Sequence, residues 1–213
     1  MRKAKDCGAQ VATHAIGDRG NRIALDTYVR VLGDDKASDH RWRIEHAQIV
    51  ALDDIPRFAQ LGVIASMQPT HATSDMPWAG DRVGEARLAG AYAWRRFLDS
   101  GTRLALGSDF PVESVDPRLG LYAAATRQDR DGYPPGGWLP GQRLTAAEAL
   151  RGFTADAAWA GRDEAEVGKL APGLRADFVV LADDPLAVPA AQLDDLTIRS
   201  TWVDGKVVYE AKQ

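Results

Sequence analysis

Cysteine is almost absent from this sequence, with Cys7 the only one among 213 residues. A single thiol excludes a disulfide framework and a zinc cluster built from thiolates. Long apolar runs are missing as well. The longest, such as FVVLA at 178–182, fall far short of the roughly 20 residues that a membrane-spanning helix needs. We therefore expect no membrane partner.

An excess of basic residues is also lacking, since 26 Lys and Arg stand against 30 Asp and Glu and give a net charge of -4. Binding to nucleic acid depends on a basic surface that neutralises phosphates, so we expect no nucleic-acid partner. The first ten residues, MRKAKDCGAQ, lack the apolar core of a signal peptide. We expect a cytoplasmic protein.

What the sequence does have is a repeated alternation of short apolar segments and amphipathic ones. Apolar segments that predict strands occupy residues 8–14, 41–46, 63–69 and 103–109. Helical patterns follow at residues 19–33, 51–62, 83–100, 116–127 and 145–162. This alternation predicts an α/β fold with parallel βα units over residues 8–160. A closed (β/α)8 barrel takes eight units, so we expect half of such a barrel.

The character of the sequence changes near residue 163. Residues after it are rich in β-forming side chains, and Asp204-Gly205 has the composition of a two-residue hairpin turn. We therefore expect two parts. Residues 1–163 form the half-barrel with four βα units, and residues 164–213 form a small β segment.

Side chains that can bind a metal ion stand at or just beyond the ends of the four predicted strands. They are His14, His46, His71 and Asp109, whereas His40 precedes its strand and is expected at the opposite rim. Each alone is more often structural. Because the carboxyl ends of barrel strands share one face, we expect the four side chains to lie near one another. Imidazole and carboxylate are the usual ligands of a catalytic zinc ion.

Longer motifs give the sequence a resemblance to a known family. The stretches that carry it are VATHAIGDRGNRIALD, RWRIEHAQI, MQPTHATSDMPWAGDRVGEAR, LALGSDFPV and VGKLAPGLRADFVVLADDPL. Together they resemble the C-terminal portion of the amidohydrolase superfamily, in the family 3 branch that includes N-substituted formamide deformylase. The resemblance implies strands five to eight of a metal-dependent hydrolase barrel, followed by part of a composite β-sandwich.

The resemblance also implies roles for individual residues. His14 and His46 match metal ligands after the fifth and sixth barrel strands, and Asp109 matches a metal ligand and proton shuttle after the eighth. His71 matches a position near the active site, for which we expect a role toward the substrate or its oxyanion. The implied cofactor is a divalent metal, zinc above all, with one or two ions in the complete enzyme. The implied reaction is hydrolysis of carbon–nitrogen bonds other than peptide bonds by a metal-activated water.

The family's metal site also uses a His-x-His pair, and this sequence contains none. We therefore expect a fragment of an amidohydrolase acting on small amide- or formamide-like molecules. On its own the chain should bind zinc weakly and be incomplete as an enzyme.

Further residues are candidates for substrate contact, and other functions stay open. Trp78, Arg82 and Trp138 are expected to bind substrate together with His71, and Arg127 could contact an acidic group of the substrate. A first alternative is a non-catalytic half-barrel that forms a homodimer or associates with a separate N-terminal half, because open parallel edges pair readily. A second alternative is a small-molecule binding module with Trp78 and Trp138 in its pocket.

Overall fold

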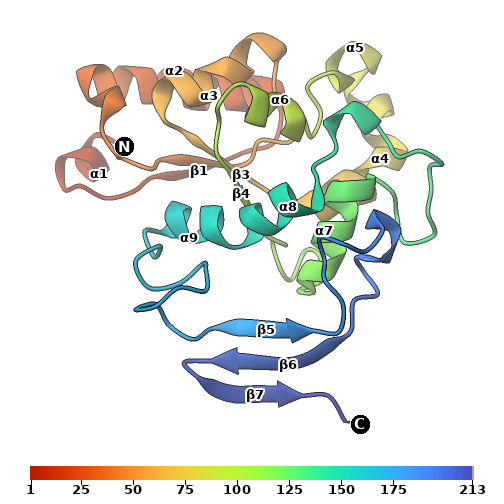
Figure 1. Ribbon diagram of the computed structural model, residues 1–213. Coiled ribbons are helices and arrows are strands. Elements are labelled where there is room, and N and C mark those ends of the chain that lie inside the picture. Colours follow the sequence, from red (N-terminus) through yellow and green to blue (C-terminus); the bar gives the residue numbers. More distant parts are fainter. Residues whose placement is uncertain (213) are drawn as a thin grey trace.

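A four-stranded parallel sheet forms the centre of the computed structural model, which describes residues 1–212 (Figure 1). Its strands follow the chain order β1-β2-β3-β4 and all three pairs are parallel. Their bounds are Ala12–Ala15 for β1, Arg43–His46 for β2, Ile64–Met67 for β3 and Leu104–Leu106 for β4. The four predicted strands and their parallel arrangement are confirmed, in shorter form. Four consecutive parallel strands are half of the eight in a closed barrel.

Helices cover this sheet and fill the connections between its strands. The α-helices are α1 (Arg2–Asp6), α2 (Asp18–Leu32), α3 (Ile55–Leu61), α4 (Pro69–Val83), α5 (Glu85–Leu88), α6 (Trp94–Asp99), α7 (Pro117–Thr126), α8 (Ala146–Phe153) and α9 (Ala155–Gly161). Short 3-10 turns lie at η1 (Gly33–Ala37), η2 (Leu52–Asp54), η3 (Pro140–Gln142) and η4 (Ala190–Gln192). None of the helices within residues 1–212 is long and apolar enough to cross a membrane.

The ends of several helices follow from local sequence signals. The Thr145 side chain accepts a hydrogen bond from the backbone N–H of Glu148, whose carboxylate accepts from the N–H of Thr145, which is a complete capping box for α8. Asp116 caps α7 by accepting from the N–H of Arg118. Gly62 ends α3 at a φ of 64°, a conformation that glycine adopts without strain.

The helix predicted over residues 83–100 is not continuous, because α5 and α6 lie within that range and residues 89–93 between them are not helical. A helix begins at Pro69, where the missing N–H is harmless, and it continues as α4 to Val83. Between α5 and α6 the chain leaves helical geometry, where it is bonded to the segment after β2. The N–H of Val50 donates to the carbonyl of Gly90 at 3.0 Å, and a Cβ on Gly90 would overlap the carbonyl oxygen of Val50. The predicted helix over 145–162 is also divided, at Thr154, into α8 and α9.

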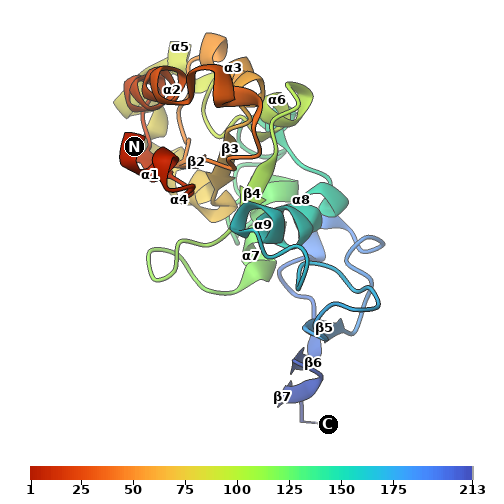
Figure 2. The ribbon, with the colours of Figure 1, turned by 90° about the vertical axis from the view of Figure 1, so that its left-hand side faces the viewer.

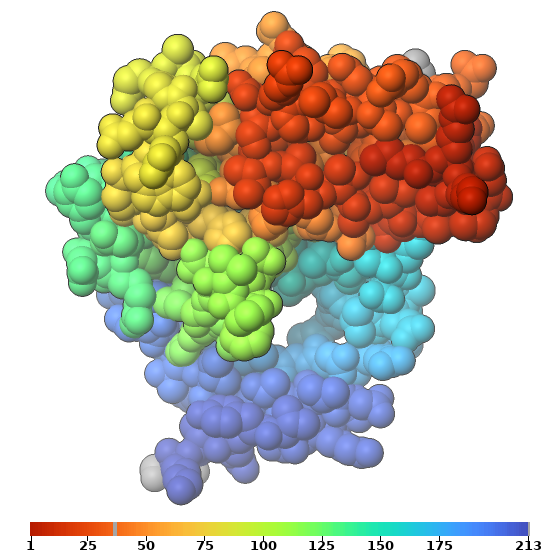
Figure 3. Space-filling view, turned by 180° about the vertical axis from the view of Figure 1, so that it is seen from behind, coloured from red at the N-terminus to blue at the C-terminus, as the bar shows by residue number. Residues whose placement is uncertain are grey.

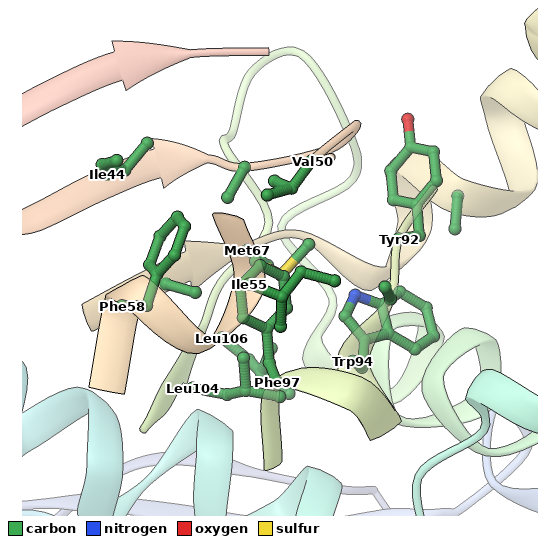
Figure 4. Packing of buried hydrophobic residues seen from close by; sticks show 14 of the residues in the cluster. Ile44, Val50, Ile55, Phe58, Met67, Tyr92, Trp94, Phe97, Leu104 and Leu106 are labelled. Atoms are coloured by element: carbon green, nitrogen blue, oxygen red, sulfur yellow. The ribbon is translucent and has the colours of Figure 1, made fainter. Parts of the chain in front are cut away.

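Large apolar side chains fill the space between the sheet and its helices (Figure 4). Phe58 of α3 and Phe97 of α6 pack edge to face with ring centroids 4.9 Å apart, and both are fully buried. Met67 and Leu106, the last residues of β3 and β4, pair in register and belong to the same core. This core fixes the strand ends from which the site residues project.

The second sheet is antiparallel, with the order β5-β6-β7, and lies at the end of the molecule away from α2 and α3 (Figures 1 and 2). Its strands are β5 (Phe178–Leu181), β6 (Ile198–Val203) and β7 (Lys206–Glu210). The hairpin at Asp204-Gly205 is confirmed, with φ values of 50° and 72° that suit a tight turn between these strands.

The small sheet is joined to the half-barrel through the segment between β5 and β6. Leu193 and Leu196 are 0% and 3% exposed and belong to the main core. Arg118 of α7 donates to the carbonyl oxygen of Leu196 at 2.6 Å. The space-filling view shows an opening between the sheet in blue and the cyan segment (Figure 3). The proposed boundary near residue 163 stays a prediction.

Candidate metal centre

Three of the predicted site residues lie together at the carboxyl ends of the parallel strands. His46 is the last residue of β2, His71 lies in the first turn of α4, and Asp109 follows β4. Each of the three residues offers one ligand atom, and these three atoms all lie within 4.8 Å of one another. Two imidazoles and a carboxylate are a ligand set typical of catalytic zinc sites, which use three protein ligands and leave one position open.

His71 has a nitrogen without a partner. Its Nε2 atom is buried and makes no hydrogen bond within the described part of the chain. It lies 3.8 Å from Oδ2 of Asp109, which is too far for a hydrogen bond. Its ring stacks on that of His46 with centroids 5.7 Å apart. A buried polar atom without a partner costs free energy, so the residues present fit a cation placed among them.

His14 lies beside this group rather than in it. Its ring meets that of His46 edge to face, with centroids 4.5 Å apart, and its side chain is exposed on the end strand β1. Its role as a metal ligand stays a prediction. His40 lies at the opposite rim, as expected, where Nε2 bonds the carbonyl of Leu61 at 2.7 Å and Nδ1 accepts from the N–H of Trp42.

The environment of His46 favours its neutral form. Burial lowers the pKa of this imidazole, and the neighbouring His14 lowers it further, while a hydrogen bond with Gln68 acts in the opposite direction. Since a metal ion binds neutral imidazole, this lowered pKa keeps His46 ready to bind at neutral pH.

The backbone at two of these residues is strained. His46 and Asp109 have φ values of 76° and 58°, and Ala47 has a φ of 44°. Left-handed conformations at residues other than glycine cost about 1–3 kcal/mol each and collect at functional sites. Hydrogen bonds hold them: the N–H of Ala47 donates to the carbonyl of Ala15 at 3.0 Å, and the N–H of Val112 donates to that of Asp109 at 2.8 Å.

A second set of polar residues, which the sequence analysis missed, is joined by hydrogen bonds close in sequence to His46 and His71. The Gln48 amide donates to Oδ2 of Asp75 at 2.7 Å and also to the hydroxyl of Tyr92, and that hydroxyl donates to Asp75. Burial is the main cause that raises the pKa of the Tyr92 hydroxyl, and its hydrogen bond to Asp75 raises the pKa further. The hydroxyl therefore stays protonated and can donate. Asp75 lies one helical turn after His71, and Gln48 lies two residues after His46. That spacing is the only signal the sequence offers.

The predicted substrate residues lie apart from the three side chains. Trp78 and Arg82 are exposed on α4, about 10 and 16 Å farther along the helix axis than His71 at its usual rise per residue. Trp138 is half-buried, and its ring packs against Tyr92 with centroids 5.8 Å apart. The substrate roles of these three residues stay predictions.

Arg127 is buried, which leaves it without access to an acidic group of a substrate. Its side chain is 1% exposed and donates to the backbone carbonyls of Tyr92 at 2.9 Å and Trp138 at 2.5 Å. Its guanidinium also lies 4.4 Å over the ring of Trp94. Arg127 holds the 127–138 loop onto α6.

A family model described as "Amidohydrolase family" matches residues 1–209. The chain belongs to the amidohydrolase family. It is 36% identical over 211 residues to "Putative amidohydrolase YtcJ" of Bacillus subtilis, covering 99% of this chain and 39% of that protein. It is 32% identical over 213 residues to "N-substituted formamide deformylase" of Arthrobacter pascens, covering 98% of this chain and 38% of that protein.

Solved structures show the same fold for this amidohydrolase chain. An uncharacterized metal-dependent hydrolase from Pyrococcus horikoshii OT3 superposes with a TM-score of 0.75 at 34% identity, over 88% of this chain and 37% of its own. Atrazine chlorohydrolase TrzN from Arthrobacter aurescens TC1, solved with zinc, gives a TM-score of 0.66 at 23% identity, over 98% and 46%. The chain thus spans less than half the length of these relatives, and the half-barrel α/β fold of a metal-dependent hydrolase is confirmed.

Proposed function

We propose that this chain contributes a divalent-metal site to an amidohydrolase that cleaves carbon–nitrogen bonds in small amide- or formamide-like molecules. The observation that supports the proposal most is the convergence of His46, His71 and Asp109, with ligand atoms within 4.8 Å of one another. The buried Nε2 of His71, which has no partner among the described residues, also supports the proposal, because a bound ion or substrate would satisfy it. A relative of 32% identity is called N-substituted formamide deformylase.

The side chains divide the chemistry between them. A bound zinc ion would lower the pKa of a coordinated water from about 15.7 to about 7, which supplies a nucleophile at neutral pH. The imidazoles of His46 and His71 would hold the ion, each through a nitrogen lone pair. Asp109, 38% exposed and therefore open to solvent, can accept the proton of the attacking water and deliver it to the leaving amine.

Two roles are open to His71, and its Nε2 atom cannot perform both at the same time. As a metal ligand it uses the lone pair of Nε2, whereas as an oxyanion partner it donates an N–H from the same atom. The 4.8 Å grouping favours the ligand role. Zinc affinity after substitution of His71 distinguishes them, because only a ligand changes it strongly.

A second candidate function is association. β1 is an end strand of the sheet, and Ile16 just beyond it is 44% exposed. Unpaired edges of this kind bind other strands, either from a second copy or from a separate N-terminal half. Sedimentation of the chain tests this, since a monomer across the micromolar range contradicts self-association.

Hydrolysis by the enzyme to which this chain contributes, in the presence of saturating zinc, tests the main proposal. We expect release of formate or acetate from N-formyl and N-acetyl amines, and loss of that release when Asp109→Asn is introduced. Equal rates for the wild type and Asp109→Asn would contradict the proposed role of the carboxylate.

A further inference from the structure

We propose that Gln68 is a positioning residue that selects the tautomer of His46, so that Nδ1 carries the proton and Nε2 faces the centre with a free lone pair. The inference rests on the proposed metal site, but it can be tested without metal. It assigns a role to a residue that does not itself contact a reacting atom.

The two side chains are joined directly. Nδ1 of His46 lies 3.0 Å from Oε1 of Gln68, and the residues are 8% and 7% exposed. Gln68 stands between β3 and α4, with extended backbone at a φ of -122° and Pro69 after it. Since β2 and β3 are neighbours in the sheet, the end of one strand places Gln68 beside the end of the other.

The orientation of the Gln68 amide follows from its other contact. Its Nε2 lies 3.5 Å from the backbone carbonyl oxygen of Ser66, a long hydrogen bond. A carbonyl oxygen only accepts, so the NH2 group must face Ser66. The flipped amide would place two oxygens against each other at Ser66. The oxygen of Gln68 therefore faces His46.

This orientation decides which nitrogen of His46 holds the proton. Because Oε1 of Gln68 cannot donate, Nδ1 of His46 must be the donor in the bond between them. A neutral imidazole carries one N–H, so Nε2 is left with a free lone pair. Protein groups that accept from the second nitrogen of a metal-binding histidine fix its tautomer and orientation, and their loss typically lowers metal affinity about 10–100-fold.

The neighbours of His46 hold its imidazole ring in place although its backbone is strained. Its left-handed backbone directs the side chain from the strand end, and the rings of His14 and His71 contact it at 4.5 and 5.7 Å. Those contacts restrict the plane of the ring but not the position of its proton. The hydrogen bond with Gln68 does fix the position of that proton.

The first experiment is a long-range proton–nitrogen NMR spectrum of the metal-free chain at about pH 8, where unperturbed histidine is neutral. We expect His46 as the Nδ1–H tautomer in the wild type. Gln68→Met, which keeps the length and removes the acceptor, should convert it to a mixture or to Nε2–H. Gln68→Glu should restore Nδ1–H.

A matched control is Gln10→Met. Gln10 donates to the backbone carbonyls of Arg41 and Ala160 at the opposite rim, so this variant also loses two hydrogen bonds but should leave the tautomer of His46 unchanged. A wild-type His46 in the Nε2–H form, or a Gln68→Met variant with the wild-type tautomer, would overturn the inference.

Zinc affinity, measured by competition with a chelating dye, is the second experiment. We expect Gln68→Met to bind zinc about 10–100-fold more weakly, Gln68→Glu to regain that affinity, and Gln10→Met to match the wild type. Unchanged affinity in Gln68→Met would overturn the positioning role. A wild type that binds no zinc would instead contradict the proposed function, while the NMR spectra still decide the tautomer.

Discussion

Nε2 of His71 lies 3.8 Å from Oδ2 of Asp109, although the two residues belong to different βα units. Only the parallel packing of β3 against β4 brings them together. The two groups make no hydrogen bond to each other, and a cation bound between them would satisfy both.

Removing the Asp109 carboxylate tests this relationship. Asp109→Asn should weaken zinc binding at least about tenfold and leave the thermal midpoint nearly unchanged, because the side chain is 38% exposed and surface substitutions have small effects. Isothermal titration with zinc and a thermal scan measure the two quantities. Equal zinc affinity in variant and wild type would exclude Asp109 as a ligand.

Tyr92→Phe should lower the free energy of unfolding by about 1–3 kcal/mol, since it removes the hydrogen bonds of the hydroxyl to Gln48 and Asp75, which keep only their bond to each other. The hydroxyl of Tyr92 bonds both Gln48 and Asp75. Denaturant titration measures the loss. Tyr133→Phe, at a tyrosine that is 62% exposed, is the control and should change the stability little; matching losses in the two variants would contradict the network.

Gly90→Ala should be strongly destabilising, by at least about 2 kcal/mol, because a Cβ there would overlap the backbone carbonyl of Val50 and overpacking is costly. Gly141→Ala is its control, since a Cβ at Gly141 would meet nothing within 4 Å. Comparing their urea midpoints tests the close approach. A Gly90→Ala variant as stable as Gly141→Ala would show that the two segments are not in contact.

Glu148 should make the stability depend on pH at the acid end. Its hydrogen bond from Arg95 lowers its pKa to about 2 from an ordinary 4.5. The stabilisation is therefore complete above pH 4.5 and is lost as the pH falls through about 2. Glu148→Gln should cost about 1 kcal/mol at pH 7, a figure reduced for solvent screening of a side chain that is one-third exposed. At pH 2 the difference should vanish; a pH-independent difference would contradict the ion pair.

The strands and the edge that carries the site could be predicted from the sequence because apolar runs ending at His46 and Asp109 are local patterns. Helix α2 was equally clear, with its amphipathic spacing and Gly33 at its end. The 83–100 helix failed because its interruption depends on Gly90 meeting Val50, a contact between distant segments. α4 was missed because Pro69 and Pro77 resemble breaks, although Pro69 is the first residue of that helix.

Within the site, residue type predicted His46 and Asp109, but not what orients them. Gln68 and Asp75 are ordinary polar residues in the sequence and gain a role only through their neighbours in space. Arg127 is a further case, because nothing local in the sequence indicates that this charged residue is buried against Trp94 and Trp138.

Zinc binding by the histidine variants tests the central claim most directly. Metal content and affinity are measured for the wild type, His46→Ala, His71→Ala and, as a control at the opposite rim, His40→Asn, with folding checked by circular dichroism. We predict one zinc ion per chain in the wild type and in His40→Asn, and affinity lowered at least about tenfold in His46→Ala and His71→Ala. Undiminished binding in His71→Ala, or no binding in the wild type, would contradict a metal centre formed by His46, His71 and Asp109.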